Sequence, residues 1–134
     1  MLKGLITMNK PSVVSIYQGL NDVTYMPNRT PEMFGANEAF IKLADYREGG
    51  IWVGHYAGNS EWERHPVGDE FLQIIGGETT LILLIDDKEV RRSMKAGELA
   101  VVPQSVWHRF ETPNGVKILT ITPQPSEHQL ERPE

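Results

Sequence analysis

Two histidines and two glutamates stand in two separate parts of the sequence with spacings that would suit a metal site. Glu63, His65 and Glu70 lie close together just before the apolar run FLQII, and His108 follows much later. Imidazole nitrogens and carboxylate oxygens bind Fe(II), Mn(II) and Zn(II), and two histidines with one or two carboxylates suit oxygenases and some hydrolytic or isomerising sites. A solvated charged loop would explain the first stretch without a metal.

Strand alternation predicts where these side chains point. In the run EFLQII, Glu70 falls on the same face as Leu72 and Ile74, and in WHRF, His108 falls on the same face as Phe110. Because these apolar neighbours are expected in the core, both polar groups should point inward. Ionisable groups are rarely buried without a partner, so their placement calls for a reason.

The pattern of apolar and turn residues from about residue 38 onward predicts an all-β fold. Short runs rich in β-branched and aromatic residues recur between turn residues, and no long segment keeps a helical period with caps. Nine or so short strands should therefore form an antiparallel barrel or sandwich. We interpret Gly76-Gly77 and Gly97 as turn residues and Asp86-Asp87 as a hairpin tip. The predicted strands are AFIKLADY, IWVGHY, EWERH, EFLQII, TTLILLI, KEVRRSM, LAVVP, WHRFET and VKILTIT.

The two ends of the chain differ from this central part. Within residues 1–37, SVVSIYQGL is interpreted as a short strand and MPNRTPEMFGAN as a loop. We expect this segment to pack on the barrel or on a partner subunit. The tail PQPSEHQLERPE is polar and rich in proline, so we expect a loose end with a solvated His128.

Composition narrows the classes of function. The 134 residues suffice for one domain, and the formal net charge of -5 argues against binding to nucleic acid or anionic membranes. The chain contains no cysteine, which excludes disulfides, thiolate metal sites and cysteine nucleophiles. No apolar run is long enough to span a bilayer, and the first residues do not form a signal peptide. We therefore expect a cytoplasmic protein.

The stretch GNSEWERHPVGDEFLQIIGG resembles the first motif of the cupin superfamily of small jelly-roll barrels, G-x5-H-x-H-x3,4-E-x6-G. His65, Glu70 and Gly77 match in type and spacing. Gly58 lies one residue nearer than the motif asks, and Glu63 replaces the first histidine.

The stretch GELAVVPQSVWHRFET resembles the second cupin motif, G-x5-P-x-G-x2-H-x3-N. Gly97, Pro103 and His108 match, whereas Ser105 and Thr112 replace the glycine and the asparagine. The resemblance implies an all-β cupin jelly roll, or double-stranded β-helix, over residues 38–122, between an N-terminal segment 1–37 and a tail 123–134.

The same resemblance implies a ligand set for a divalent ion. Carried over position by position, the four ligands are Glu63, His65, Glu70 and His108, and the ion is Fe, Mn, Zn or Ni. Carboxylate oxygen at the first position remains a competent ligand. Without a metal, His65 would pair with Glu70 while Glu63 reaches solvent.

These residues leave three functional hypotheses open. The first is a metal-dependent dioxygenase or isomerase acting on a small organic molecule, the second a non-catalytic binding or sensing module, and the third metal-free acid–base chemistry by His65 and Glu70. His55 is interpreted as structural rather than as a proton shuttle. An aromatic pocket for an apolar or aromatic ligand is one interpretation of four residues, but core packing is favoured for most of them. They are Trp62, Phe71, Trp107 and Phe110. Open sheet edges and the resemblance favour a homodimer.

Overall fold

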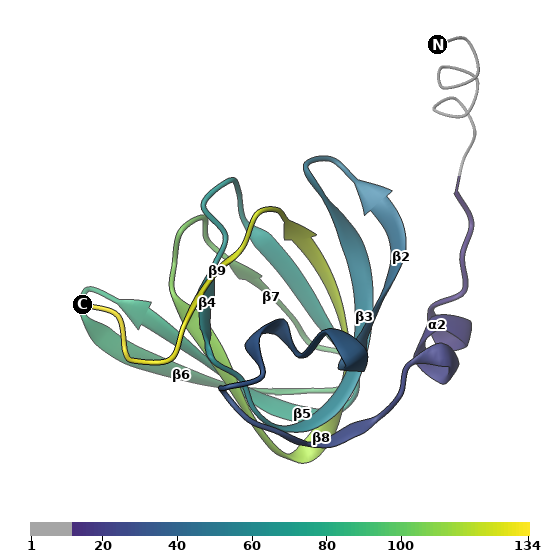
Figure 1. The fold of residues 1–134 in the computed structure, drawn as a ribbon, viewed down its shortest axis with the longest axis horizontal. Coiled ribbons are helices and arrows are strands. Elements are labelled where there is room, and N and C mark those ends of the chain that lie inside the picture. The colour runs from purple at the N-terminus through teal and green to yellow at the C-terminus, as the bar shows by residue number, and fades with distance from the viewer. Residues whose placement is uncertain (1–11) are drawn as a thin grey trace, which may run out of the picture.

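Nine strands form one sheet within residues 12–134, the part of the chain that this computed structural model describes. The sheet curves into a barrel (Figure 1), which confirms the predicted all-β fold. No helix of the described residues is long and apolar enough to cross a membrane. The elements are α2 Ile16–Asp22, β1 Met26–Arg29, the 3₁₀ helix η1 Phe34–Ala39, β2 Phe40–Tyr46, β3 Gly49–Asn59, β4 Trp62–Arg64, β5 Glu70–Ile85, β6 Lys88–Lys95, β7 Leu99–Val102, β8 His108–Pro123 and β9 Glu127–Gln129.

Strands β3, β8 and β5 form the spine of the sheet, because β8 pairs antiparallel with both of the others. β2 extends the sheet beside β3, and both β6 and β7 pair with β5. β4 pairs with β8 on one side and with β9 on the other. This arrangement brings the beginnings of β5 and β8 to the short strand β4, where the charged stretch of the sequence lies.

β5 and β8 are each one long strand, where the sequence predicted two shorter ones. The prediction of a turn at Gly76-Gly77 is wrong, because both residues lie inside β5. The β5–β8 register shifts on either side of this pair, and Gly77 lies opposite Val116 with a positive φ of 73°. Such irregularities bend a strand without ending it. The two long strands can therefore follow the curve of the barrel.

Two other predicted turns are confirmed. Gly97 lies in the turn between β6 and β7 with φ 90°, and Asp86-Asp87 forms the tip between β5 and β6. Both aspartates have positive φ, as expected for a two-residue hairpin turn of the type that matches strand twist.

The core inside the barrel confirms the alternation that the sequence predicted. Leu72 and Ile74 are fully buried and Phe110 nearly so. Their apolar neighbours come from several strands, so the interior is filled by side chains except near one end. The cluster comprises Ala36, Ala39, Tyr56, Leu72, Ile74, Leu81, Met94, Val102, Phe110, Val116 and Ile118.

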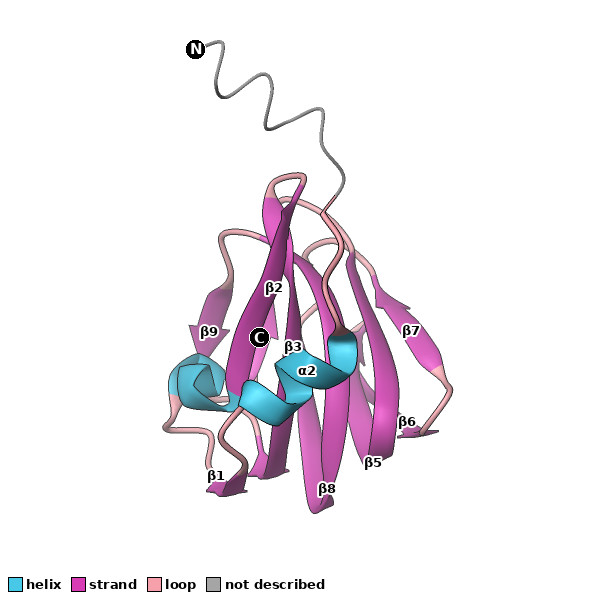
Figure 2. Ribbon diagram, turned by 90° about the vertical axis from the view of Figure 1, so that its right-hand side faces the viewer, coloured by secondary structure: helices cyan, strands magenta, loops and turns pink. Residues whose placement is uncertain are grey.

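The prediction of a strand in SVVSIYQGL is wrong, because residues 16–22 form helix α2 on the outside of β2 and β3 (Figure 2). Ser15 caps the helix by accepting a hydrogen bond from the Gln18 N–H at 3.0 Å. Ile16 and Leu20 share a helical face. This face belongs to a second apolar cluster, apart from the barrel core, which also includes Val53 and Leu119. The backbone approaches closely at Gly19, where an added Cβ would lie 2.5 Å from Leu43. Residues 16–22 are therefore not available as an open edge strand.

Segments on both sides of the predicted barrel range 38–122 also belong to the sheet. β1 runs parallel to β3, and β9 continues the sheet beyond β4. MPNRTPEMFGAN, predicted as a loop, contains β1 and the beginning of η1. The tail 123–134, predicted to be loose, contributes β9. These additions surround the end of the barrel at which the polar residues gather.

Gly77, the glycine with positive φ in β5, allows a direct test of this topology. Gly77→Ala should destabilise the protein more than Gly97→Ala, because its Cβ would lie 2.3 Å from the Gly115 carbonyl oxygen while Gly97 has open space. The left-handed backbone alone should cost about 1–2 kcal/mol at either position. Urea unfolding of both variants measures the difference. Equal losses of stability would contradict the close β5–β8 contact.

Candidate metal centre

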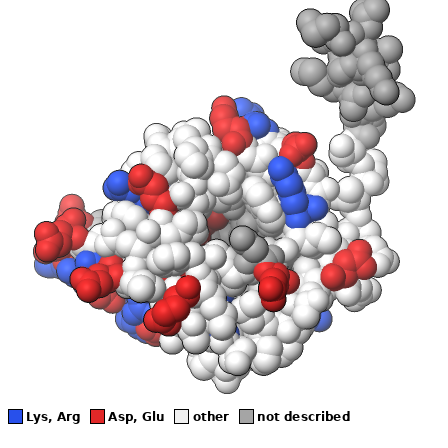
Figure 3. Space-filling model, viewed as in Figure 1, with Lys and Arg blue, Asp and Glu red and all other residues white. Residues whose placement is uncertain are grey.

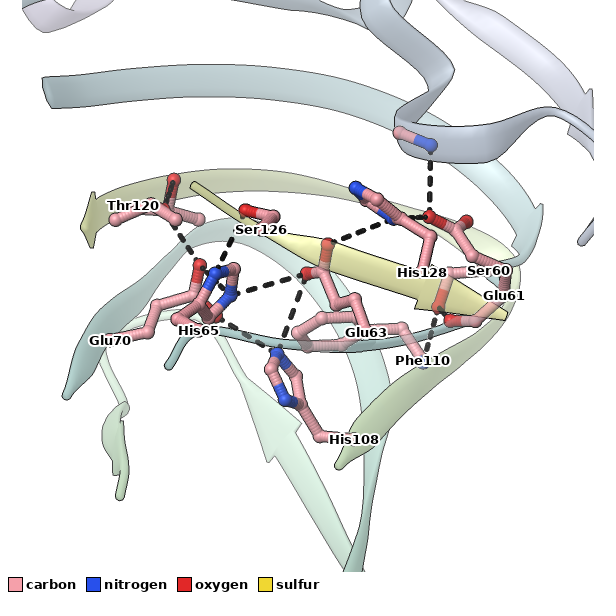
Figure 4. Close-up of polar contacts among 12 residues, drawn as sticks. Ser60, Glu61, Glu63, His65, Glu70, His108, Phe110, Thr120, Ser126 and His128 are labelled. Carbon is pink, nitrogen blue, oxygen red and sulfur yellow. Dashed lines mark hydrogen bonds and ion pairs between the residues drawn. The ribbon is translucent and has the colours of Figure 1, made fainter. Parts of the chain in front are cut away.

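The four residues predicted as metal ligands meet at one end of the barrel. β4 and β8 pair so that Glu63 lies opposite His108. His65 follows the end of β4, and Glu70 begins β5 with its side chain on the inner face. One ligand atom from each of the four lies within 4.8 Å of the others. Figure 4 shows their side chains converging from three strands.

The imidazole Nε2 atoms face the carboxylates from two sides. His65 Nε2 lies 3.3 Å from Glu70 Oε2 and 3.7 Å from Glu63 Oε1. His108 Nε2 lies 3.1 Å from Glu70 Oε1 and 3.4 Å from Glu63 Oε1. Three of the side chains are almost fully buried, and that of Glu63 is 19% exposed. The alternative in which Glu63 simply reaches solvent does not describe this arrangement.

Hydrogen bonds at the far side of each ring fix the imidazole orientations. His108 Nδ1 lies 3.0 Å from the Val106 carbonyl oxygen, which can only accept, so Nδ1 carries the proton. His65 Nδ1 lies 2.9 Å from Ser126 Oγ. Metal-binding histidines usually have such a partner on the other ring nitrogen, and it holds the ring in place. Both Nε2 atoms are thereby directed toward the common point.

Glu70 is held in the same way by a hydroxyl group. Thr122 Oγ1 donates a hydrogen bond of 2.6 Å to Glu70 Oε2 and lies 3.1 Å from Thr120 Oγ1. These threonines come from β8, which also carries His108 at its other end. One long strand thus supplies both a candidate ligand and the groups that orient another.

The residues present fit a divalent ion. Within residues 12–134, His65 Nε2 is buried and makes no hydrogen bond of normal geometry, although Glu70 Oε2 lies 3.3 Å away. A buried polar atom without a partner is uncommon, and here it points to the place where the other three ligands converge. The two carboxylates also compensate the charge of +2, while the two neutral imidazoles can bind through their nitrogen atoms.

In the metal-free protein the four groups compensate one another's charge. Burial lowers the pKa of both histidines, but the nearby carboxylates of Glu63 and Glu70 raise it overall, to about 9 for His65 and about 10 for His108. Burial raises the pKa of Glu63, yet the two histidines hold it well below its usual value, and the pKa of Glu70 is lowered similarly. With raised pKa values both imidazoles would be positively charged at pH 7, and an ion would have to displace one proton from each.

A cavity of about 310 Å³ opens beside this cluster. Figure 3 shows a hollow in this face, with charged side chains of both signs spread around it. Apolar and polar groups share the cavity wall, so it suits a small organic molecule. The lining residues include Arg29, Phe40, Trp52, Tyr56, Glu63, His65, Glu70, Phe110, Thr122, Ser126 and His128.

A second cluster of charged residues, Glu61, Arg29 and His128, lies beside the same cavity, and the sequence analysis did not predict it. His128, predicted to be solvated, instead lies with Nδ1 2.5 Å from Oε2 of the buried Glu61. Its hydrogen bond to Glu61 raises the pKa of His128, against the effect of burial. Arg29 Nη2 lies 3.3 Å from Glu61 Oε1. Although Glu61, Glu63 and His128 are close enough to hold an ion, the adjacent guanidinium disfavours a second cation there.

His55 and most of the aromatic residues considered as pocket lining lie outside this cavity. His55 lies outside the cavity and stacks on Tyr25 with ring centroids 4.3 Å apart. Burial, with a smaller effect of Lys117, lowers the pKa of His55. Of the four aromatic residues weighed as pocket lining, only Phe110 borders this cavity. Trp62 is buried beneath Arg109, 5.3 Å from its guanidinium carbon.

The family model described as the cupin domain matches residues 52–122, which is more than half of the chain. The chain therefore belongs to the cupin family, as the two motifs indicated. A search of curated proteins finds no match.

Solved structures confirm the fold. Protein NMB1881 from Neisseria meningitidis is 22% identical, with a TM-score of 0.62 over 84% of this chain and 100% of that one. A cupin-2 domain protein from Shewanella frigidimarina is 22% identical, with a TM-score of 0.54 over 63% and 79%. Hydroquinone 1,2-dioxygenase PnpCD, in complex with Cd²⁺ and 4-hydroxybenzonitrile, is 16% identical, with a TM-score of 0.60 over 83% and 72%. At these identities the likeness establishes the fold alone.

Metal binding should release protons. Because both histidines are protonated at pH 7 and must bind through neutral rings, Mn²⁺ or Zn²⁺ should displace about two protons per ion, and affinity should rise from pH 7 toward pH 10. Calorimetry in buffers with different ionisation enthalpies measures the number. His55→Ala serves as the control and should leave it unchanged. Tight binding without proton release would contradict the proposed ligand set.

The hydroxyl that orients His65 should matter for affinity. Ser126→Ala removes the partner of His65 Nδ1, so the affinity for Zn²⁺ should fall by roughly 10–100-fold. Ser93→Ala, at an exposed position of β6, is the matched control. Competition with a fluorescent chelator gives both dissociation constants. If the two variants bind Zn²⁺ equally well, Ser126 does not support the site.

Proposed function

We propose that this cupin is a divalent-metal-dependent enzyme that acts on a small organic molecule, with dioxygenation as the reaction class to test first. One observation carries the proposal. Two imidazole Nε2 atoms and carboxylate oxygens converge within 4.8 Å at the side of a cavity large enough for a substrate. Glu63, His65, Glu70 and His108 would hold the ion.

The ion, when bound, would supply Lewis acidity or, as Fe(II), one-electron chemistry with dioxygen. The protein's own contribution is to orient and to shield. Val106, Ser126 and Thr122 keep three of the ligands directed at one point. Two carboxylates neutralise a divalent ion and favour harder, oxygen-binding metals. The partly apolar wall of the cavity would hold the substrate body and limit access of water.

Dioxygenation is favoured over isomerisation by two considerations. Two histidines with a carboxylate and open positions form the ligand set of non-haem iron oxygenases. Among the similar structures, PnpCD is a dioxygenase named in complex with a phenolic compound. The site here has one glutamate more than the set of two histidines and one carboxylate. The likeness to PnpCD therefore suggests which compounds to assay first, and it does not identify the substrate.

Turnover should depend on the ligand histidines. Protein loaded anaerobically with Fe(II) should consume dioxygen with at least one member of a panel of hydroquinones, catechols and small hydroxy acids. Chelation should abolish this activity, and His65→Ala or His108→Ala should lower it by about a hundredfold or more while the protein stays folded. An oxygen electrode and circular dichroism provide the two measurements, and His55→Ala is the matched control.

Other outcomes distinguish the alternatives. Conversion detected by NMR without oxygen uptake, but sensitive to chelators, would replace dioxygenation by an isomerase reaction. Thermal stabilisation by panel compounds without any conversion would indicate a non-catalytic binding module. Activity that is indifferent to chelators would contradict the metal-dependent proposal and favour acid–base chemistry by His65 and Glu70.

A further inference from the structure

Arg29 occupies a position in the cavity wall that the metal centre does not explain. It ends β1, outside the residues matched by the cupin family model, and its side chain is only 5% exposed. β1 approaches β3 closely at Gly58, where an added Cβ would lie 2.2 Å from the Arg29 carbonyl oxygen. Arg29 lines the same cavity as Glu63, His65 and Glu70. A cation is thus built into the wall that surrounds the candidate metal site.

The guanidinium group is held firmly in this position. Its central carbon lies 4.6 Å from the centroid of the Tyr56 ring and 5.8 Å from that of Phe40. Nη2 contacts Glu61 Oε1 at 3.3 Å. Stacking on aromatic faces and one ion pair restrain the side chain, so a ligand would meet a pre-positioned cation.

Most of the hydrogen-bonding capacity of Arg29 is not used. A guanidinium carries five N–H donors, and the one side-chain hydrogen bond that Arg29 makes within residues 12–134 uses Nη2. Nε is buried and has no hydrogen-bond partner in the described part of the chain. Glu61 Oε2 accepts from the Gly35 N–H at 2.9 Å and lies beside His128, so Glu61 contacts Arg29 through Oε1 alone. Nε itself is closed off from the cavity, but Arg29 lines the cavity wall, so donors at the end of its guanidinium group can meet an acceptor that enters there.

Planar carboxylates match these donors best. Arginine binds a carboxylate through two parallel hydrogen bonds, which a hydroxyl or an amide oxygen cannot reproduce. The aromatic side chains of Phe40, Trp52, Tyr56 and Phe110 also line the cavity and offer contacts to an apolar body. The cavity therefore joins an anion-binding point to an apolar wall and a candidate metal centre.

We propose that the substrate is a small carboxylic acid whose carboxylate binds Arg29 while its reactive part faces the metal centre. This assignment of substrate class rests on the proposed function. It also makes Arg29 a specificity-determining residue supplied by the N-terminal segment. Recognition by Arg29 itself needs no metal, so it can be measured separately from catalysis.

The test compares acids with their uncharged amides. Acetate, benzoate and pyruvate are titrated against acetamide, benzamide and pyruvamide by calorimetry, with metal-free and with Mn²⁺-loaded protein. At least one acid should bind about tenfold or more tightly than its amide in both forms. If no metal binds at all but the metal-free protein keeps this preference, the proposed function fails and the carboxylate site stands.

Variants assign the preference to Arg29. Arg29→Gln combined with Glu61→Gln removes both charges of the ion pair together, so no unpaired carboxylate is left buried. This variant should lose the preference for the acid, and circular dichroism checks its fold. Arg29→Lys keeps the charge but loses the planar fork, so it should lower the preference at least severalfold and serves if the double variant does not fold.

Three results would overturn the inference. One is that no acid binds more tightly than its amide to the metal-free protein. Another is that the double variant keeps the full preference, which would place the carboxylate elsewhere, for instance on the ion. The last applies if the double variant does not fold. In that case, Arg29→Lys would bind the acid over its amide with the same preference as the unaltered protein.

Discussion

Charge compensation among four buried side chains is the constraint on which this end of the barrel depends. Two carboxylates and two imidazoles are removed from water, which is tolerated only if each is paired. Without a metal, protons on His65 and His108 supply the compensation, and their raised pKa values express it. A divalent ion supplies the same positive charge. The strands that meet at β4 therefore hold four mutually compensating groups, in which a divalent ion would take the place of two protons.

The segments outside the cupin match extend this site instead of merely covering it. β1 brings Arg29, η1 brings the Gly35 N–H, and the segment around β9 brings Ser126 and His128. All four contact either Glu61 or a candidate ligand. The residues matched by the cupin model thus supply the four candidate ligands, while the segments on either side supply the groups that would select a ligand. This division agrees with the general rule that a fold does not fix a function.

The sequence predicted the features that depend on local pattern. Alternation placed Glu70 and His108 inside, and the two motifs brought together the four residues that the structure places within 4.8 Å. It did not reveal Arg29 or His128, because each is paired with Glu61 across 32 and 67 positions of sequence. The two-residue spacing of Ser126, just before β9, and His128, within it, was an available signal. Helix α2 was missed because seven residues show too little of a helical period, although Ser15 is a regular cap residue.

The most direct measurement is anomalous diffraction from crystals of the protein loaded with Mn²⁺ or Zn²⁺. The account predicts one strong peak about 2.0–2.2 Å from Nε2 of His65 and His108 and from oxygens of Glu63 and Glu70, with the ring nitrogens Nδ1 still bonded to Ser126 and Val106. A fully loaded crystal with no peak between these side chains, or with the ion bound only at the surface, would contradict it.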